Sequence, residues 1–293
     1  MAVLEPYRGG YYLWKYLPSI EAAAIVSVLW ALVTVAHVWK IWKTRAWFNI
    51  AFAVGGFMEF IGYAARASAH DKTGNLMPFV IQNTMILLAP VLFAASIYMT
   101  LGRVIRAVKG ERFSFIRPGR LTKLFVAGDI LSLTIQGSAA GLMIISKLAK
   151  MGQTIVIVGL VVQIVIFGLF CVTAVSFHRR MKRDVVVAAT CARGESLKWE
   201  QLLRMLYGVS GLIMVRSLFR VVEFIMGTDG YLLSTEWPIY VFDAVPMLFA
   251  MAIYWWWWPS MVSSVGSGNE NWAAMTSMSD LSPGAAKKAP TLP

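Results

Sequence analysis

The chain has 293 residues, of which 58% are hydrophobic and only 14% are charged, with a formal net charge of +12. A soluble domain carries about 25% charged residues, and so few charges leave too little polar surface to cover a chain of this size. The composition therefore predicts an integral membrane protein and excludes disordered, collagen-like and disulfide-scaffold proteins.

Seven stretches are long and apolar enough to cross the hydrocarbon core as helices, which takes about 20 residues each. They lie at about residues 19–39, 47–67, 79–102, 123–146, 153–178, 203–226 and 237–258. None alternates with the period of two that is typical of a transmembrane strand. The predicted fold is therefore all-α. It is a polytopic membrane protein with a seven-transmembrane helix bundle over residues 19–258, an extracellular N-terminal segment 1–18 and a flexible cytosolic tail 259–293.

The basic residues lie mostly on one side of the predicted membrane. Nineteen of the 27 Lys and Arg residues fall in the connections after the first, third and fifth spans or in the C-terminal tail. Because cytosolic connections collect Lys and Arg, the N-terminus is predicted outside and the C-terminus in the cytosol. The net charge is thus mainly a topology signal, and no nucleic-acid partner is expected. The Trp run at 255–258 is interpreted as part of an aromatic belt at the membrane interface.

Polar side chains occur inside the predicted spans, where an ionisable group costs about 2.5–3.5 kcal/mol and needs a partner or a cavity. The candidate residues for substrate binding or a charge network are Glu59, Tyr63 and Arg66 in the second span, Gln82 in the third, Gln136 in the fourth, Gln163 in the fifth, Arg216, Arg220 and Glu223 in the sixth, and Tyr240 and Asp243 in the seventh. Most of them fall in the predicted outer half of the bundle. We therefore expect a polar pocket between the helices that opens outward or laterally.

The spacing of the charges predicts how they pair. Glu59 with Arg66, and Arg220 with Glu223, share a helix face, which suits either helix packing or a ligand site. We expect Arg220 and Glu223 to join a buried network with Glu59 or Asp243. Asp243 has no opposite charge at helical spacing on its own span, so it is predicted to be the uncommitted carboxylate. Such a group could bind an amine headgroup or carry a proton.

Seven short segments, one for each span, form a joint pattern. They are Tyr16–Ser19, Glu59–Arg66, Gln82–Pro90 with Ala94–Tyr98, Asp129–Gly137, Gly159–Gln163, Arg216–Glu223 and Glu236–Asp243. In this order they resemble the fungal lipid-translocating exporter family, the Rta-like seven-transmembrane proteins, over about residues 14–258. The resemblance implies a fungal plasma-membrane protein that exports sphingoid bases or sterol-like amphiphiles and confers resistance to toxic compounds.

Two functions compete on this pattern. The first is a floppase-like exporter that moves amphiphilic lipids or toxic amphiphiles to the outer leaflet. No Walker A segment is present, so ATP hydrolysis by this chain is not expected. The alternative is a seven-helix lipid or stress sensor without transport activity. In both cases the expected partners are membrane lipids or an amphiphilic small molecule.

An enzyme is not expected. A metal-dependent lipid hydrolase needs about three converging ligands and an open position. The three histidines, His37, His70 and His178, are predicted at opposite membrane faces, so they cannot share one ion. Neither a metal nor another cofactor is expected. Cys171 and Cys191 lie in an apolar run and a basic loop, so we expect no disulfide between them.

Overall fold

The computed structural model describes residues 14–258, except for 15, 71–72, 109, 112–113, 115–117, 144–147, 184–195, 228–229, 231 and 233–234. Its long helices are α1 (Ile20–Thr44), α2 (Ile50–Ser68), α3 (Leu76–Ala107), α4 (Pro118–Met143), α5 (Ala149–Arg183) and α7 (Ser196–Met226). The short 3₁₀ helix η1 (Trp47–Asn49) leads into α2. The last helix of the bundle consists of the π-helix η3 (Ile239–Ala244), which continues directly into α9 (Val245–Trp256). The all-helical prediction is confirmed for this part of the chain. The predicted tail 259–293 and most of the segment 1–18 lie outside the described residues.

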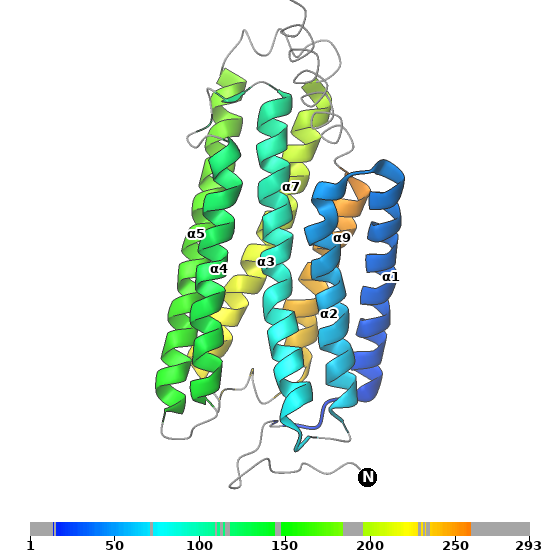
Figure 1. Cartoon of the computed structure of the whole chain (residues 1–293), viewed down its shortest axis with the longest axis vertical. Helices are drawn as coiled ribbons and strands as arrows, with labels where there is room; N and C mark the ends of the chain where they lie inside the picture. The colour runs from blue at the N-terminus through cyan, green and yellow to red at the C-terminus, as the bar shows by residue number, and fades with distance from the viewer. Residues whose placement is uncertain are drawn as a thin grey trace, which may run out of the picture.

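The helices form one bundle in which successive helices run in opposite directions (Figure 1). The chain before α1 and the end of α9 therefore lie at opposite ends of the bundle. Helix α3 is the central element, because it packs against α2, α4 and α7. In its most apolar window 72% of the residues are buried, against 28% in α1 and in α5. The peripheral helices thus leave most of their apolar surface on the outside of the bundle.

The outside of the bundle is apolar. On α5 the side chains of Val158, Val161, Val165, Leu169 and Val172 are all exposed, and they recur every three or four residues along one face. Exposed apolar stripes of this length are avoided on soluble monomers, and they suit a helix that faces lipid. Figure 1 shows α5 at the edge of the bundle, where such a face would meet the membrane.

Five helical segments are long and apolar enough to cross a membrane, namely α1, η1 with α2, α3, α5, and η3 with α9. Over the part of the chain that the structure describes, α4 and α7 are not among them. In α7 the residues Arg216, Arg220 and Glu223 lie within two turns of one another and lower the hydropathy of the segment. The same polar residues that mark a candidate site therefore weaken the signal of a membrane span.

The ends of several helices differ from the predicted spans. Helix α5 covers 149–183 instead of 153–178, and α7 begins at 196 instead of 203. The last turn of α5 carries Arg180, Lys182 and Arg183. Basic side chains stabilise the C-terminal end of a helix through its dipole, so the helix continues beyond the apolar stretch that defined the prediction.

The Trp run at the end of α9 also differs from the prediction of a simple interfacial belt. The Trp258 indole N–H donates to Thr44 Oγ1 at 3.1 Å. The Lys40 ammonium donates to the Trp255 carbonyl oxygen and lies 4.0 Å from the centroid of the Trp255 ring. These contacts fasten the end of α9 to the end of α1. Within the run, Trp256 is the most exposed side chain and fits the belt interpretation best.

Candidate functional site

The polar residues of α2 face those of the last helix in antiparallel order. From the end of the bundle inward, the facing sets are Arg66 with Glu236, Tyr63 with Ile239 and Tyr240, and Glu59 with Asp243. On α2, Glu59 and Arg66 are seven residues apart and share a face, whereas Glu236 precedes η3 and Asp243 lies within it. This contact between α2 and the segment Glu236–Asp243, which we call the seam, has an ion pair at its outer end and two carboxyl groups at its inner end.

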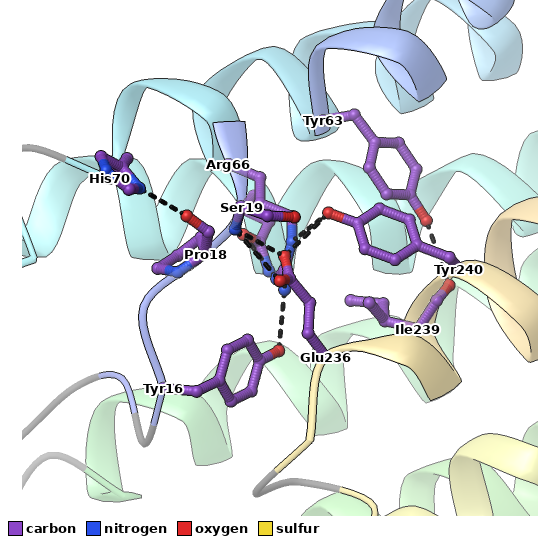
Figure 2. Close-up of polar contacts among 10 residues, drawn as sticks. Tyr16, Pro18, Ser19, Tyr63, Arg66, His70, Glu236, Ile239 and Tyr240 are labelled. Atoms are coloured by element: carbon purple, nitrogen blue, oxygen red, sulfur yellow. Dashed lines mark hydrogen bonds and ion pairs between the residues drawn. The ribbon is translucent and has the colours of Figure 1, made fainter. Parts of the chain in front are cut away.

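The outer end of this contact is a dense hydrogen-bond network around Arg66 and Glu236, which we call the outer clamp (Figure 2). Arg66 is buried, and each of its guanidinium nitrogens has a partner. Nε donates to the Tyr240 hydroxyl at 3.1 Å, and Nη1 donates to Gln82 Oε1 at 3.4 Å. Nη2 donates to the Tyr16 hydroxyl at 2.8 Å and to Glu236 Oε1 at 2.9 Å. Each guanidinium nitrogen therefore has a partner, and four of its five N–H groups are bonded.

Glu236 ties the start of α1 to this clamp. The Ser19 backbone N–H lies 3.0 Å from both carboxylate oxygens of Glu236, and the Tyr240 hydroxyl donates to its Oε1 at 2.9 Å. The predicted pairing of Arg66 with Glu59 is wrong. Seven residues of helix rise about 10 Å, so Glu59 and Arg66 share a face but lie too far apart for an ion pair.

A second charge group lies deeper between α2, α7 and η3. We call Glu59, Arg216, Arg220, Glu223 and Asp243, all of them buried, the inner cluster. Arg220 Nη1 lies 3.0 Å from Glu223 Oε2, and its Nη2 lies 2.7 Å from Asp243 Oδ2. Arg216 Nε forms an ion pair with the other oxygen of Asp243, Oδ1. The expected network of Arg220 and Glu223 with Asp243 is confirmed. The prediction that Asp243 is the uncommitted carboxylate is wrong, because Arg216 and Arg220 of α7 both pair with it.

Pro90 explains why Arg216 can be held so firmly. In an α-helix each N–H bonds to the carbonyl four residues earlier, and proline has no N–H. Pro90 lies inside α3 and therefore leaves the Ile86 carbonyl without its usual helical donor. Arg216 Nη2 donates to this oxygen at 2.6 Å. One guanidinium thus bridges the freed carbonyl of α3 and the carboxylate of η3.

The π-helix places Asp243 at this junction. The Val245 N–H donates to the Tyr240 carbonyl, five residues earlier, as π-helical geometry requires. Pro246 follows at once and removes one further helical donor. Widened turns of this kind are frequent at functional sites. The backbone next to the inner cluster is accordingly less regular than that of the other long helices.

Glu59 differs from the other members of the inner cluster. Its side chain is 1% exposed, and neither of its carboxyl oxygens has a hydrogen-bond partner. It interacts electrostatically with Asp243, Arg216 and Arg220, so it belongs to the same group of charges. Among the buried charged side chains of the described residues, Glu59 is the one without a hydrogen bond or an ion pair.

The remaining predicted residues lie in other places. Gln136 Nε2 donates to Gln163 Oε1 at 3.1 Å and so joins α4 to α5. The structure does not bring this pair into bonding contact with the inner cluster. Gln82 belongs to the outer clamp through its contact with Arg66. The polar residues of the sequence therefore separate into an interior charge cluster, a clamp and a helix-packing pair.

Several polar contacts in the structure were not predicted from the sequence. Glu236 and Tyr16 were absent from the candidate residues, although Glu236 precedes Asp243 by the same seven residues that separate Glu59 from Arg66. Glu236 lies before η3, however, so a helical spacing does not reveal it. A second missed contact joins the Tyr98 hydroxyl to Asp129 Oδ2 at 2.8 Å, between α3 and α4.

Each of the three histidines has its own, separate hydrogen-bond partner. Nδ1 of His37 lies 2.9 Å from the Val33 carbonyl, and Nδ1 of His70 lies 2.7 Å from the Pro18 carbonyl. His178 lies 3.0 Å from the Tyr207 hydroxyl. Over the residues that the structure describes, no group of three or more His, Cys, Asp or Glu side chains is arranged to hold a metal ion. Cys171 is free, and Cys191 lies outside the described residues.

Comparison with known proteins supports the resemblance drawn from the motifs. The family described as RTA1 like protein matches residues 52–265. Protein RTM1 of Saccharomyces cerevisiae is 41% identical over 68% of this chain and 63% of its own length. Protoporphyrin uptake protein 1 of the same species is 37% identical over 70% of this chain and 66% of its own length. The chain thus spans slightly less than two thirds of both relatives.

A more distant yeast relative is named sphingoid long-chain base transporter RSB1. It is 24% identical over 80% of this chain and 70% of its own length. No solved structure matches the chain. The apolar helices and these relatives together show a multi-pass membrane protein with transporter-like relatives. Because the family match covers well over half of the sequence, this chain belongs to the RTA1-like protein family.

Proposed function

We propose that this protein exports amphiphilic lipids such as sphingoid bases, or toxic amphiphiles, from the inner to the outer leaflet of the plasma membrane. One observation carries the proposal, namely the inner cluster of five ionisable side chains inside an apolar bundle. Ionisable groups at membrane depth are costly and mark substrate or ion pathways in transporters. The outer clamp and the Gln136–Gln163 pair join helices without a buried unpaired charge, whereas the inner cluster contains the unpaired Glu59.

The proposed topology has seven spans, with the N-terminus outside and the C-terminus in the cytosol. Its support is the placement of the described bases. They gather at the end of the bundle where α1, α3 and α5 terminate, as in Lys43, Arg106 and Arg183. By the positive-inside rule that end faces the cytosol. The outer clamp then lies near the extracellular side and the inner cluster lies between the clamp and the cytosol.

The names of the relatives favour amphiphiles as the substrate class. One relative is named as a transporter of sphingoid long-chain bases and another as a protoporphyrin uptake protein. Sphingoid bases carry an ammonium group, and protoporphyrin carries carboxylates. The inner cluster contains both signs of charge, but Asp243 and Glu223 are already paired with arginines. The carboxyl group that remains for an added cation is that of Glu59, which favours an amine-bearing amphiphile.

Reconstitution of the purified full-length chain into vesicles tests the proposal. A fluorescent long-chain base is added, and its movement between leaflets is followed by the fraction that a membrane-impermeant quencher reaches. We expect faster movement than in protein-free vesicles, and equal movement with the Glu21→Gln variant, whose altered side chain is exposed in the first turn of α1. Binding of the base without accelerated movement would reject transport and favour a lipid sensor.

A further inference from the structure

We propose that Glu59 is a reversible proton-binding site, and that its ionisation draws an arginine of the inner cluster away from Asp243. The proposal deepens the proposed function, on which its role in transport rests. It assigns the coupling ion, a proton, to one carboxyl group. The groups involved stand on α2 (Glu59), α7 (Arg216 and Arg220) and η3 (Asp243).

The other buried ionisable groups do not offer such a site. In the outer clamp the Arg66 guanidinium has partners on all three nitrogens. Asp129 accepts a hydrogen bond from Tyr98 at Oδ2 only, and His37 has a carbonyl partner at Nδ1 only. Among the carboxyl groups that the structure describes, only that of Glu59 combines complete burial with the absence of a hydrogen bond on either oxygen.

The described arrangement fits the protonated form of Glu59. An ionised carboxylate that is buried without a donor carries an uncompensated desolvation penalty of several kcal/mol. The facing carboxylate of Asp243 adds a like charge, and two neighbouring carboxyl groups resist ionising together. A neutral carboxylic acid avoids both penalties. With Glu59 neutral, the two arginines balance Asp243 and Glu223, and the cluster carries no net charge.

Ionisation of Glu59 requires a donor, and the neighbouring elements show which ones are available. Tyr63 on α2 already donates to the Ile239 carbonyl at 3.4 Å. On α7, Arg216 and Arg220 interact electrostatically with Glu59, while both are bonded to Asp243. An arginine can therefore donate a hydrogen bond to ionised Glu59 if it weakens or breaks its ion pair with Asp243.

Such an exchange would move helices relative to one another, because the three groups stand on three elements. Arg216 also donates to the Ile86 carbonyl of α3. A shift of the Arg216 side chain would therefore change a contact of this central helix. The packing there is tight. A Cβ atom added at Gly62 of α2 would lie 2.6 Å from Ile86 Cγ1. The π-helical turn at Asp243 is the irregular segment that can absorb the shift.

The charge balance links the proton to the substrate. When Glu59 releases its proton to water on one side of the membrane, the cluster gains one negative charge. A cationic headgroup entering the cluster restores neutrality, and its departure must be accompanied by a new proton on Glu59. The inferred cycle thus exchanges one proton for one amine-bearing amphiphile, with no co-reactant other than water as the proton carrier.

Infrared spectroscopy of the purified full-length protein in nanodiscs tests the proton site without any substrate. The carbonyl stretch of a protonated carboxylic acid is followed during a pH titration. We expect a band at neutral pH that is lost in Glu59→Gln and kept in Glu21→Gln. A contribution of Asp129 is identified by its loss in Asp129→Asn. A band that is unchanged in folded Glu59→Gln protein overturns the proposal.

Chemical labelling of the wild-type chain keeps the test valid if Glu59→Gln does not fold. A hydrophobic carbodiimide reacts with protonated carboxyl groups in apolar surroundings, and the modified residue is located by peptide mass spectrometry. We expect the label on Glu59 and not on the exposed Glu21. Absence of label on Glu59, with other buried carboxyl groups modified, overturns the proposal.

The transport assay separates this proposal from the proposed function. In vesicles with an imposed pH gradient, movement of the long-chain base by the wild-type protein should respond to the gradient, and movement by Glu59→Gln should lose that response. A gradient response that survives in Glu59→Gln overturns the coupling role and leaves the exporter in place. If the wild type moves no base under any gradient, the proposed function fails, and the infrared and labelling results still decide the proton site.

Discussion

The outer clamp and the inner cluster are built on the same seam of α2 and the last helix, yet their bonding differs. In the clamp, Arg66 and Glu236 use every nitrogen and both carboxylate oxygens in hydrogen bonds. In the inner cluster, Asp243 holds two arginines while Glu59 has no bond at all. A network in which every nitrogen and carboxylate oxygen is bonded favours one arrangement, whereas a network with one unpaired acid and two shared bases has at least two. We therefore regard the clamp as structural and the cluster as functional.

Position in the fold adds to this contrast. The clamp joins the chain before α1 to the start of the last helix, and the carboxylate side chain of Glu236 remains 19% exposed. The inner cluster lies against the central helix α3 and is almost completely buried. Burial makes each lost partner in the cluster more costly, because water cannot replace it. The same kind of substitution should therefore lower the thermal unfolding midpoint more in the inner cluster than in the outer clamp.

The largest expected effect is that of Asp243→Asn. Loss of this carboxylate leaves the buried Arg216 and Arg220 short of a counter-charge, and breaking a buried pair costs about 3–5 kcal/mol. The matched change on the facing helix, Glu59→Gln, removes no bond and should leave the thermal unfolding midpoint nearly unchanged. Thermal denaturation of both variants in the same detergent gives the comparison. Equal losses in the two variants would show that Glu59 is bonded after all.

A smaller loss is expected for Glu236→Gln in the clamp. The substitution removes the charge that pairs with Arg66, and a hydrogen bond to a charged group contributes about 1.5–3 kcal/mol. The partial exposure of Glu236 lets water replace part of that contribution. The control is Glu21→Gln, the same change on an exposed side chain, which should not shift the unfolding midpoint. If Glu236→Gln proves as damaging as Asp243→Asn, the clamp and the cluster do not differ as described.

The smallest effect is expected for Gln82→Leu, at the edge of the clamp. Its bond to Arg66 is long, at 3.4 Å, and interhelical hydrogen bonds in membranes average about 0.6 kcal/mol. The neighbouring Asn83 is exposed and bonds only locally, to the Phe79 carbonyl, so Asn83→Leu is the matched control. The two unfolding midpoints should lie close together, with Gln82→Leu slightly lower. A large loss at Gln82 would assign it a role in the cluster beyond the clamp.

Much of the architecture follows from the sequence alone. The apolar stretches predict helices, their alternation with basic connections predicts an antiparallel bundle, and the family motifs predict the family that the comparison confirms. These features are local or compositional, because burial in lipid requires each segment to satisfy its own backbone bonds. Helical periodicity also places Glu59 and Arg66, and likewise Arg220 and Glu223, on shared faces.

Only the tertiary structure decides which charges meet. The pairing of Arg66 with Glu236, and of Asp243 with two arginines of α7, depends on the register between helices that are far apart in the sequence. Spacing along one helix contains no information about that register, so it suggested the wrong partner for Arg66 and left open whether Arg220 and Glu223 would join Glu59 or Asp243. The same packing leaves Glu59 unpaired, because the arginines nearest to it are already held by Asp243 and, for Arg216, by the carbonyl that Pro90 frees in α3.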